Sequence, residues 1–298
     1  MFLKFQGMKK IEILILGGGL SGISTSFHAG HERCLILEKN NYLLGHIASK
    51  KARGFTWDEG PHVSFTKSPY IKSIFEKAVN EEFFEFEAKI SNYYKGSWID
   101  HPAQVNLHQV SEPLRSKCVT SFLKQSEDEI NDAPNSYYDW LVKSFGNEFT
   151  NTFANVYTKK YWTLHAKEMG TDWLGSRIYR PSQLDFLEGS RHKIDKQTHY
   201  FKKFRYPKSG GFEKYASLLE KNSNFNLEEE VYEIDLSKKT VKTKTGETYT
   251  YNTLINTMPL PIFLNRCLQT KEKLSEEINL LDCSKLFLIN IEVPAPRK

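Results

Sequence analysis

Residues 13–22 read Ile-Leu-Ile-Leu-Gly-Gly-Gly-Leu-Ser-Gly. The apolar run that ends at Leu16 is typical of a buried parallel strand, and the glycines after it have the spacing of a dinucleotide-binding turn. In such a turn Gly17 allows a tight bend, Gly19 lets the backbone approach phosphates, and Gly22 lets the helix pack closely on the strand. The stretch predicts a βαβ unit that binds a dinucleotide.

A second apolar run, 35–37, ends in Glu38, about twenty residues after the first glycine. A carboxylate at this point can accept hydrogen bonds from the two hydroxyls of an adenosine ribose. The helix that begins near Leu20 and Ser21 would direct its free N–H groups at the pyrophosphate. An ordinary glycine-rich loop is the alternative, but the order strand, glycines, helix, strand and acid favours the dinucleotide site.

The composition is that of a globular chain: of 298 residues, 39% are hydrophobic and 13% aromatic, and no apolar run has the length of a membrane span. The net charge of +5 comes from dispersed lysines and argues against nucleic acid as a partner. The four cysteines lack metal-ligand or redox spacing, and the short segment before the first strand does not resemble a secretion signal. We therefore expect no metal site and a cytoplasmic location; a homo-oligomer is compatible with the sequence.

The order of elements predicts an α/β fold, in which a Rossmann-like domain carries an inserted, mainly helical substrate domain. We expect the Rossmann-like domain at 1–68 and 205–265, the insertion at 69–204, and the start of a further, truncated substrate-domain segment at 266–298. Helical periodicity predicts helices at 69–79, 113–124, 136–145, 148–162 and 213–220. Strands are expected within 83–100, at 226–234, 239–244 and 248–251, and from 254 to the loop at Pro259.

Three other stretches carry chemistry-bearing residues. The polar turn 39–46 contains Gly45, and His62 follows a Gly-Pro turn; an ordinary loop and a structural histidine are the alternatives. Residues 157–162 read Tyr-Thr-Lys-Lys-Tyr-Trp, with Arg177 and Arg180 further on. Aromatic rings can stack on a base and arginine can bind phosphates bidentately, although a helix that buries its aromatics and solvates its lysines would have the same sequence.

With these stretches the sequence resembles the FAD-dependent family that includes UDP-galactopyranose mutases, within the wider group of amine oxidases and protoporphyrinogen oxidases. The resemblance is carried by 17–22 with Glu38, by Gly-Pro-His-Val at 60–63, by Tyr-Thr-Lys-Lys at 157–160 with Trp162, and by Thr-Met-Pro at 257–259. The stretch 206–211, Tyr-Pro-Lys-Ser-Gly-Gly, looks more like the oxidase branch. Leu44 stands where the family usually has a glycine.

The resemblance implies that the cofactor is FAD and that the substrate is a nucleotide-sugar or another small molecule. The implied cofactor contacts are Gly17, Gly19, Leu20, Ser21, Gly22, Glu38, Lys39, Gly45, His46, Gly60, Pro61, His62, Val231, Thr257 and Pro259. The implied substrate contacts are Tyr157, Trp162, Arg177, Arg180 and Tyr200, and the implied catalytic residues are His62, Arg177 and Arg180.

A mutase of this family would isomerise the sugar without net redox change, for cell-surface polysaccharide biosynthesis. The alternatives are an oxidase in which oxidised flavin accepts a hydride, and a catalytically silent flavoprotein.

Overall fold

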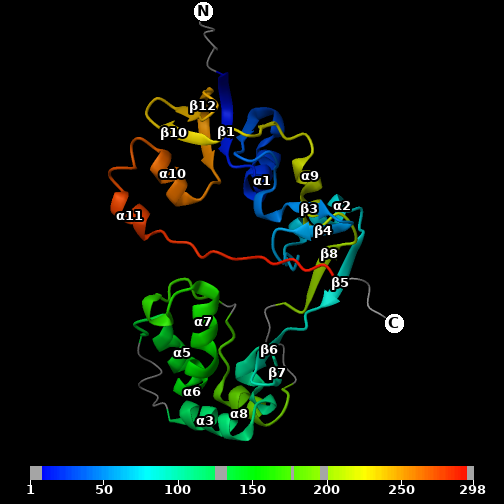
Figure 1. The fold of residues 1–298 in the computed structure, drawn as a ribbon, viewed down its shortest axis with the longest axis vertical. Helices are drawn as coiled ribbons and strands as arrows, with labels where there is room; N and C mark the ends of the chain where they lie inside the picture. Colours follow the sequence, from blue (N-terminus) through cyan, green and yellow to red (C-terminus); the bar gives the residue numbers. More distant parts are fainter. Residues whose placement is uncertain (1–8, 125–132, 176–177, 195–200, 294–298) are drawn as a thin grey trace, which may run out of the picture. The chain divides into compact units, whose positions relative to one another are not determined.

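The computed structural model describes residues 9–124, 133–175, 178–194 and 201–293. The chain forms two compact units (Figure 1). Unit 1 comprises Met1–Glu85 and Arg205–Lys298, and unit 2 comprises Phe86–Phe204. The chain leaves unit 1 through β5 (Phe83–Glu87) and returns through its partner strand β8 (Lys203–Pro207).

Unit 1 is built on a six-stranded sheet with the order β10-β11-β12-β1-β2-β9. Its centre is parallel: β1 (Lys9–Leu16) lies between β12 (Thr248–Asn256) and β2 (Cys34–Leu37). The outer strands are β9 (Phe225–Asn226) on one side and the antiparallel pair β10 (Val231–Asp235) and β11 (Thr240–Thr243) on the other. This is the parallel βαβ arrangement that the sequence predicts.

Both faces of β2 and of residues 13–16 of β1 are buried, as their uninterrupted apolar sequence requires. Ile13 and Ile15 of β1 pack with Ile23 of α1 (Leu20–Ala29) on one face. Leu14 and Leu16 pack on the other face, with residues of β2, β10, β11 and β12. Because the pairings of β1 with β2 and β12 are parallel, the carboxyl ends of these three strands lie at one edge of the sheet, where Leu16 pairs with both Leu37 and Asn256.

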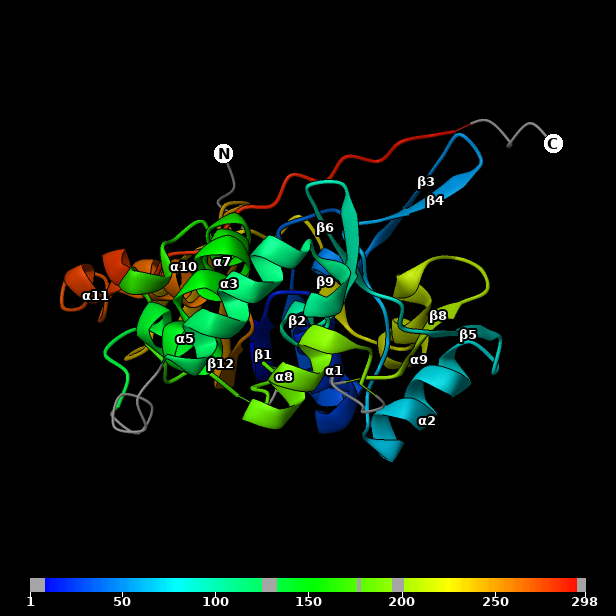
Figure 2. The ribbon, with the colours of Figure 1, turned by 90° about the horizontal axis from the view of Figure 1, so that it is seen from below.

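The remaining elements of unit 1 flank this sheet. Helix α2 (Pro69–Ala78) begins at Ser68, whose side chain accepts a hydrogen bond from the Ile71 N–H, and has proline in its first turn. A hairpin of β3 (Ser49–Ala52) and β4 (Phe55–Asp58) extends away from the sheet (Figure 2). Helices α9 (Ser217–Glu220), α10 (Leu260–Arg266) and α11 (Ser275–Leu280) complete the unit.

Unit 2 is mainly helical. Its helices are α3 (Glu112–Leu123), α5 (Tyr137–Phe145), α6 (Asn147–Phe149), α7 (Asn155–Trp162) and α8 (Gln183–Arg191). A π-helical turn at Thr150–Ala154 joins α6 to α7, so that one helical segment runs from 147 to 162. The strands β6 (Ser91–Tyr94) and β7 (Ser97–Asp100) form a hairpin, and the core includes Leu141, Phe145 and Phe186.

Several sequence expectations need correction. The single strand expected at 226–234 is two strands at opposite edges of the sheet, β9 and β10, because residues 227–230 run from one to the other. The two strands expected at 248–251 and from 254 are one continuous strand, β12. The helix expected at 213–220 is a 3-10 turn at Phe212–Ala216 followed by α9.

The compact units also differ from the boundaries drawn on the sequence. Residues 69–85 group with unit 1 rather than with the insertion, since Ile74 of α2 belongs to the hydrophobic core around Ile15. Residues 266–298 group with unit 1 as well. Within the described part of that segment, α11 is followed by irregular chain from 281 to 293.

Candidate dinucleotide and substrate sites

The glycine turn after β1 has a geometry that only glycine allows at two positions. Gly17 has φ +101° and donates its N–H to the Leu37 carbonyl at 2.9 Å, which ties the turn to the end of β2. A Cβ on Gly22 would lie 2.0 Å from the Gly17 carbonyl oxygen. Helix α1 therefore approaches the turn as closely as backbone contact permits, and the predicted roles of these two glycines match the geometry.

Gly19 serves a different purpose. Its backbone is extended (φ −70°, ψ 178°), and an added Cβ would meet nothing within 4 Å. The first intrahelical bond of α1 runs from Ile23 N–H to the Gly19 carbonyl at 3.1 Å, so the N–H groups of Leu20 and Ser21 lie ahead of it. Open space beside a helix N-terminus fits the pyrophosphate of a dinucleotide.

Glu38 lies at the carboxyl end of β2, next to this turn, and is only 6% exposed. Its carboxylate accepts the Gly18 N–H at 2.7 Å through Oε2 and the Asn40 N–H at 2.9 Å through Oε1. Glu229 donates its N–H to the Glu38 carbonyl at 2.8 Å, which brings the start of β10, with buried Val231, toward the acid. Lys39, which follows Glu38, is exposed.

We expect Glu38→Ala to weaken binding of the dinucleotide, which the sequence resemblance implies is FAD. The change would remove the expected ribose acceptor. It would also leave the buried Gly18 N–H without its carboxylate partner, which lowers the free energy of unfolding by about 1–3 kcal/mol. Glu38→Gln, which keeps one acceptor oxygen, is the matched control and should lose less. FAD affinity measured by flavin fluorescence during titration checks this; equal affinity in the parent and in Glu38→Ala would remove Glu38 from the site.

Residues 44–46 lie directly against the glycine turn. Leu44 has φ +75° and donates its N–H to the Gly18 carbonyl at 2.8 Å, and a Cβ on Gly45 would be 3.4 Å from the Gly19 Cα. The His46 carbonyl accepts a hydrogen bond from His62 Nε2 at 2.7 Å. Because a carbonyl can only accept, Nε2 of His62 carries the proton.

The Gly-Pro-His loop is thereby attached to the same region. Gly60 has φ +136°, and His62 N–H donates to the Gly60 carbonyl at 2.9 Å, so that the chain turns tightly around exposed Pro61. The structure brings the predicted cofactor residues Gly17, 19–22, Glu38, Gly45, His46 and 60–62 together on unit 1.

Thr257 contacts the same turn from β12. Its hydroxyl lies 2.9 Å from the Leu16 carbonyl and 3.0 Å from the Gly17 carbonyl, and its N–H donates to the Leu16 carbonyl. Pro259 immediately precedes α10. The contacts of Thr257 therefore support the shape of the glycine turn.

The predicted substrate residues belong to unit 2. Tyr157 and Trp162 of α7 are 60% and 38% exposed, and Tyr161 between them stacks on Tyr157 with ring centroids 5.6 Å apart. The Trp162 ring also lies 5.5 Å from that of Trp173. These aromatics are on the surface of unit 2 rather than in its core. Arg180 is exposed as well, while Arg177 and Tyr200 lie outside the described residues.

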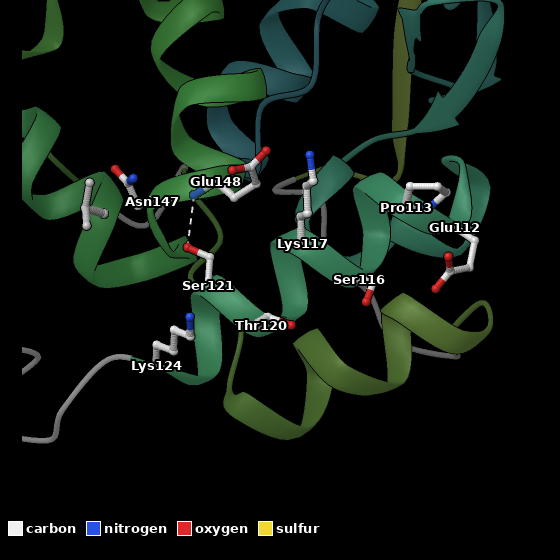
Figure 3. Close-up of a pocket in the computed structure, with 10 residues that line it drawn as sticks. Glu112, Pro113, Ser116, Lys117, Thr120, Ser121, Lys124, Asn147 and Glu148 are labelled. Atoms are coloured by element: carbon white, nitrogen blue, oxygen red, sulfur yellow. Dashed lines mark hydrogen bonds between the residues drawn. The ribbon is translucent and has the colours of Figure 1, made fainter.

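Unit 2 also has a groove of about 760 Å³ between α3 and the start of α6 (Figure 3). Lysines and carboxylates both line it, with Lys117 and Lys124 on α3 and Glu148 opposite. The Ser121 hydroxyl accepts a hydrogen bond from the Glu148 N–H at 3.0 Å. One backbone N–H at the N-terminus of α6 is therefore already bonded to a side chain. Tyr157, Trp162 and Arg180 are not among its lining residues.

Sequence reasoning missed a polar cluster in unit 1 centred on Asp58. Asp58 accepts hydrogen bonds from Ser49 on the neighbouring strand β3, and from Tyr206 and the backbone of Phe212 in one distant segment of the chain. The two consecutive glycines 210 and 211, both with φ +81°, were the available signal that the chain adopts a special conformation here.

The described residues contain neither a candidate membrane span nor a candidate metal cluster. None of their helices has the length and apolar character needed to cross a bilayer. No group of three or more of their His, Cys, Asp and Glu side chains is placed to hold a metal ion.

Comparison with known proteins agrees with this geometry. Residues 15–78 match the family of NAD(P)-binding Rossmann-like domains. A 79-residue stretch, 25% of this chain, is 35% identical to 15-cis-phytoene desaturase of Glycine max, of which it covers 14%. Residues 15–78 therefore belong to a Rossmann-like domain.

The whole chain is similar to solved structures. It superposes on reduced UDP-galactopyranose mutase with a TM-score of 0.80 and 24% identity, covering 91% of this chain and 60% of that one. It also matches a protein from Exiguobacterium sp. 255-15 that was assigned as a protoporphyrinogen oxidase, with a TM-score of 0.62 and 18% identity over 87% of this chain and 62% of that one. The fold is thus the one seen in these two proteins, as the sequence resemblance implies, and the chain spans about three fifths of their length.

Proposed function

We propose that the chain binds FAD in unit 1 and acts on a nucleotide-sugar, as a mutase of the UDP-galactopyranose type in cell-surface polysaccharide biosynthesis. The observation that supports FAD binding is the cluster of residues at the carboxyl edge of the parallel strands. There, open space at Gly19 adjoins a helix N-terminus, and the Glu38 carboxylate is held beside it. The fold shared with a mutase supports the substrate class.

Each part of the cluster suits one part of FAD. The backbone at 17–22 would bind the pyrophosphate, Glu38 the ribose, and the backbone of Val231 the adenine. The loops at 45–46 and 60–62 would lie along the flavin. The imidazole ring of His62, which is held by its hydrogen bond to the His46 carbonyl, would lie against the flavin ring. When bound and reduced, the flavin would supply a nucleophile for the sugar.

Unit 2 would hold the nucleotide. Exposed Trp162 and Tyr157 offer ring faces on which a base can stack, and Arg180, with Arg177, offers forked donors to a diphosphate. Burial raises the pKa of the Cys118 thiol to about 12. Burial thus makes this thiol less reactive than an exposed cysteine, which agrees with a packing role.

The test is UDP titration of the flavin-loaded chain, followed by tryptophan fluorescence or calorimetry. Trp162→Ala should weaken UDP binding by about 1–3 kcal/mol, the contribution of one base–aromatic stack. Arg180→Lys should also weaken it, because lysine cannot reproduce the bidentate fork. Trp98→Ala is the matched control, since Trp98 is a 68% exposed tryptophan of the same unit.

If UDP does not bind to the folded, flavin-loaded parent, the mutase proposal fails. If Trp98→Ala weakens binding as much as Trp162→Ala, the aromatic residues of α7 are not the base site. The second candidate is then an oxidase that transfers a hydride to flavin. The Tyr-Pro-Lys-Ser-Gly-Gly stretch and the local match to a desaturase favour it, and oxygen consumption with an amine or alkene donor would detect it.

A further inference from the structure

The Asp58 carboxylate, at the end of β4, receives three donors. Its Oδ1 accepts the Ser49 hydroxyl and, at 3.0 Å, the N–H of Phe212; its Oδ2 accepts the Tyr206 hydroxyl. Burial, and then the Asp58 carboxylate, raise the pKa of Tyr206 above its ordinary value. The phenol is therefore protonated at neutral pH and available as the donor.

These bonds hold the segment 210–213 against the base of the β3–β4 hairpin. A Cβ on Gly211 would lie 2.2 Å from Ser49 Oγ and 2.7 Å from Asp58 Oδ1, so the loop fits only because glycine stands there. Glu213 adds a return contact, since its Oε2 accepts the Ser49 N–H at 2.8 Å. The loop conformation is thus fixed from both sides.

The residue that this loop presents is Phe212. It is 7% exposed, and its ring packs against the His62 imidazole with centroids 5.3 Å apart. His62 in turn donates through Nε2 to the His46 carbonyl. One chain of contacts therefore runs from the Asp58 carboxylate through Phe212 to the two loops that we assign to the flavin.

We propose that Asp58 is a positioning residue: through the 210–213 loop it holds Phe212 against His62 and so sets the orientation of the His62 ring toward the flavin. The flavin half of this proposal rests on the proposed function, while the His62 half does not. Because Asp58 acts through Phe212, replacing the Asp58 side chain should change the orientation of the His62 ring indirectly.

The test compares variants of the full chain labelled with ¹⁵N-histidine, before and after FAD is added. In Asp58→Ala we expect the His62 Nε2–H signal to shift or be lost, and the visible spectrum of bound flavin to shift with it. Asp58→Asn should restore both, since its amide oxygen can still accept from Ser49 and Phe212 while its NH₂ donates to the Tyr206 oxygen. Phe212→Leu should reproduce the His62 shift, and in combination with Asp58→Ala should add little to it.

Asp235→Ala is the control for a merely structural effect. The Asp235 carboxylate likewise accepts several hydrogen bonds, from the backbone of Ser237 and Lys238 and from the Gln269 side chain, in the same unit. Its loss should lower the unfolding temperature without moving the His62 signal or the flavin spectrum.

The outcomes separate the two proposals. An unchanged His62 signal in folded Asp58→Ala, or an equal change in Asp235→Ala, overturns the positioning role. If Asp58→Ala does not fold, an unchanged signal in Phe212→Leu overturns it instead. If the His62 signal shifts in Asp58→Ala while the parent chain does not bind FAD, the positioning of His62 is supported and the proposal of FAD as the cofactor fails.

Discussion

Gly19→Ala is expected to abolish FAD binding while leaving the stability of the flavin-free chain unchanged or slightly higher. The backbone of Gly19 is one that alanine adopts readily, and the added methyl meets no protein atom within 4 Å. The methyl would instead occupy the space that the pyrophosphate needs at the start of α1. Gly→Ala at a compatible position stabilises by about 0.4–1 kcal/mol through the unfolded state.

FAD titration and thermal unfolding of the same samples would measure the two effects. Unaltered FAD affinity in Gly19→Ala would place the phosphates elsewhere, whatever the rest of the turn does. A large loss of stability would mean instead that Gly19 is needed by the fold.

Gly22→Ala should have the opposite effect and destabilise unit 1 even without ligand. The new Cβ would lie 2.0 Å from the Gly17 carbonyl oxygen and 3.1 Å from Thr257 Oγ1, so α1 must move away from the turn. We expect a loss of about 3 kcal/mol, the upper part of the usual range for overpacking. Helix propensity alone predicts that Gly22→Ala raises the free energy of unfolding by about 1 kcal/mol. The sign of the measured change in stability therefore decides between overpacking and helix propensity.

Chemical denaturation checks this result. Ser21→Ala, one position earlier on the exposed side of α1, is the matched control for helix propensity and should leave the midpoint nearly unchanged. A Gly22→Ala chain as stable as the parent would contradict the close contact between α1 and the turn.

The parallel core of unit 1 and the residues at its carboxyl edge could be predicted because local sequence determines them. An apolar run, spaced glycines and an acid lie within 13–38, and the pairing of β1 with β2 follows from the short helix between them. Helix α3, helix α5 and the helical segment 147–162 of unit 2 were likewise predicted from apolar residues that recur at helical spacing, whereas α8 was not predicted. Ser136 even caps α5 through its side chain, as its residue type favours.

What could not be predicted depends on contacts between distant parts of the chain. Residues 226–234 were expected to form one strand, yet they divide because Asn226 pairs with Leu37 of β2 while Val231 starts the pairing with β11. The Asp58 cluster joins residues about 150 positions apart, and no local pattern indicates such a pairing. The roles of Tyr157, Trp162 and Arg180 stay predictions that only ligand binding can test.

The pairing of β1 with β12 also has a consequence for biosynthesis. Strand β1 leaves the ribosome before the other strands of this sheet, yet one of its two neighbours comprises residues 248–256. At about 5–20 residues per second, translation keeps β1 waiting for this partner for roughly 10–50 seconds. Unit 2 lies wholly within that interval and is contiguous, so it has all of its own sequence before the sheet of unit 1 can close. The apolar residues of β1 in unit 1 therefore wait longest in the nascent chain for their partner strand.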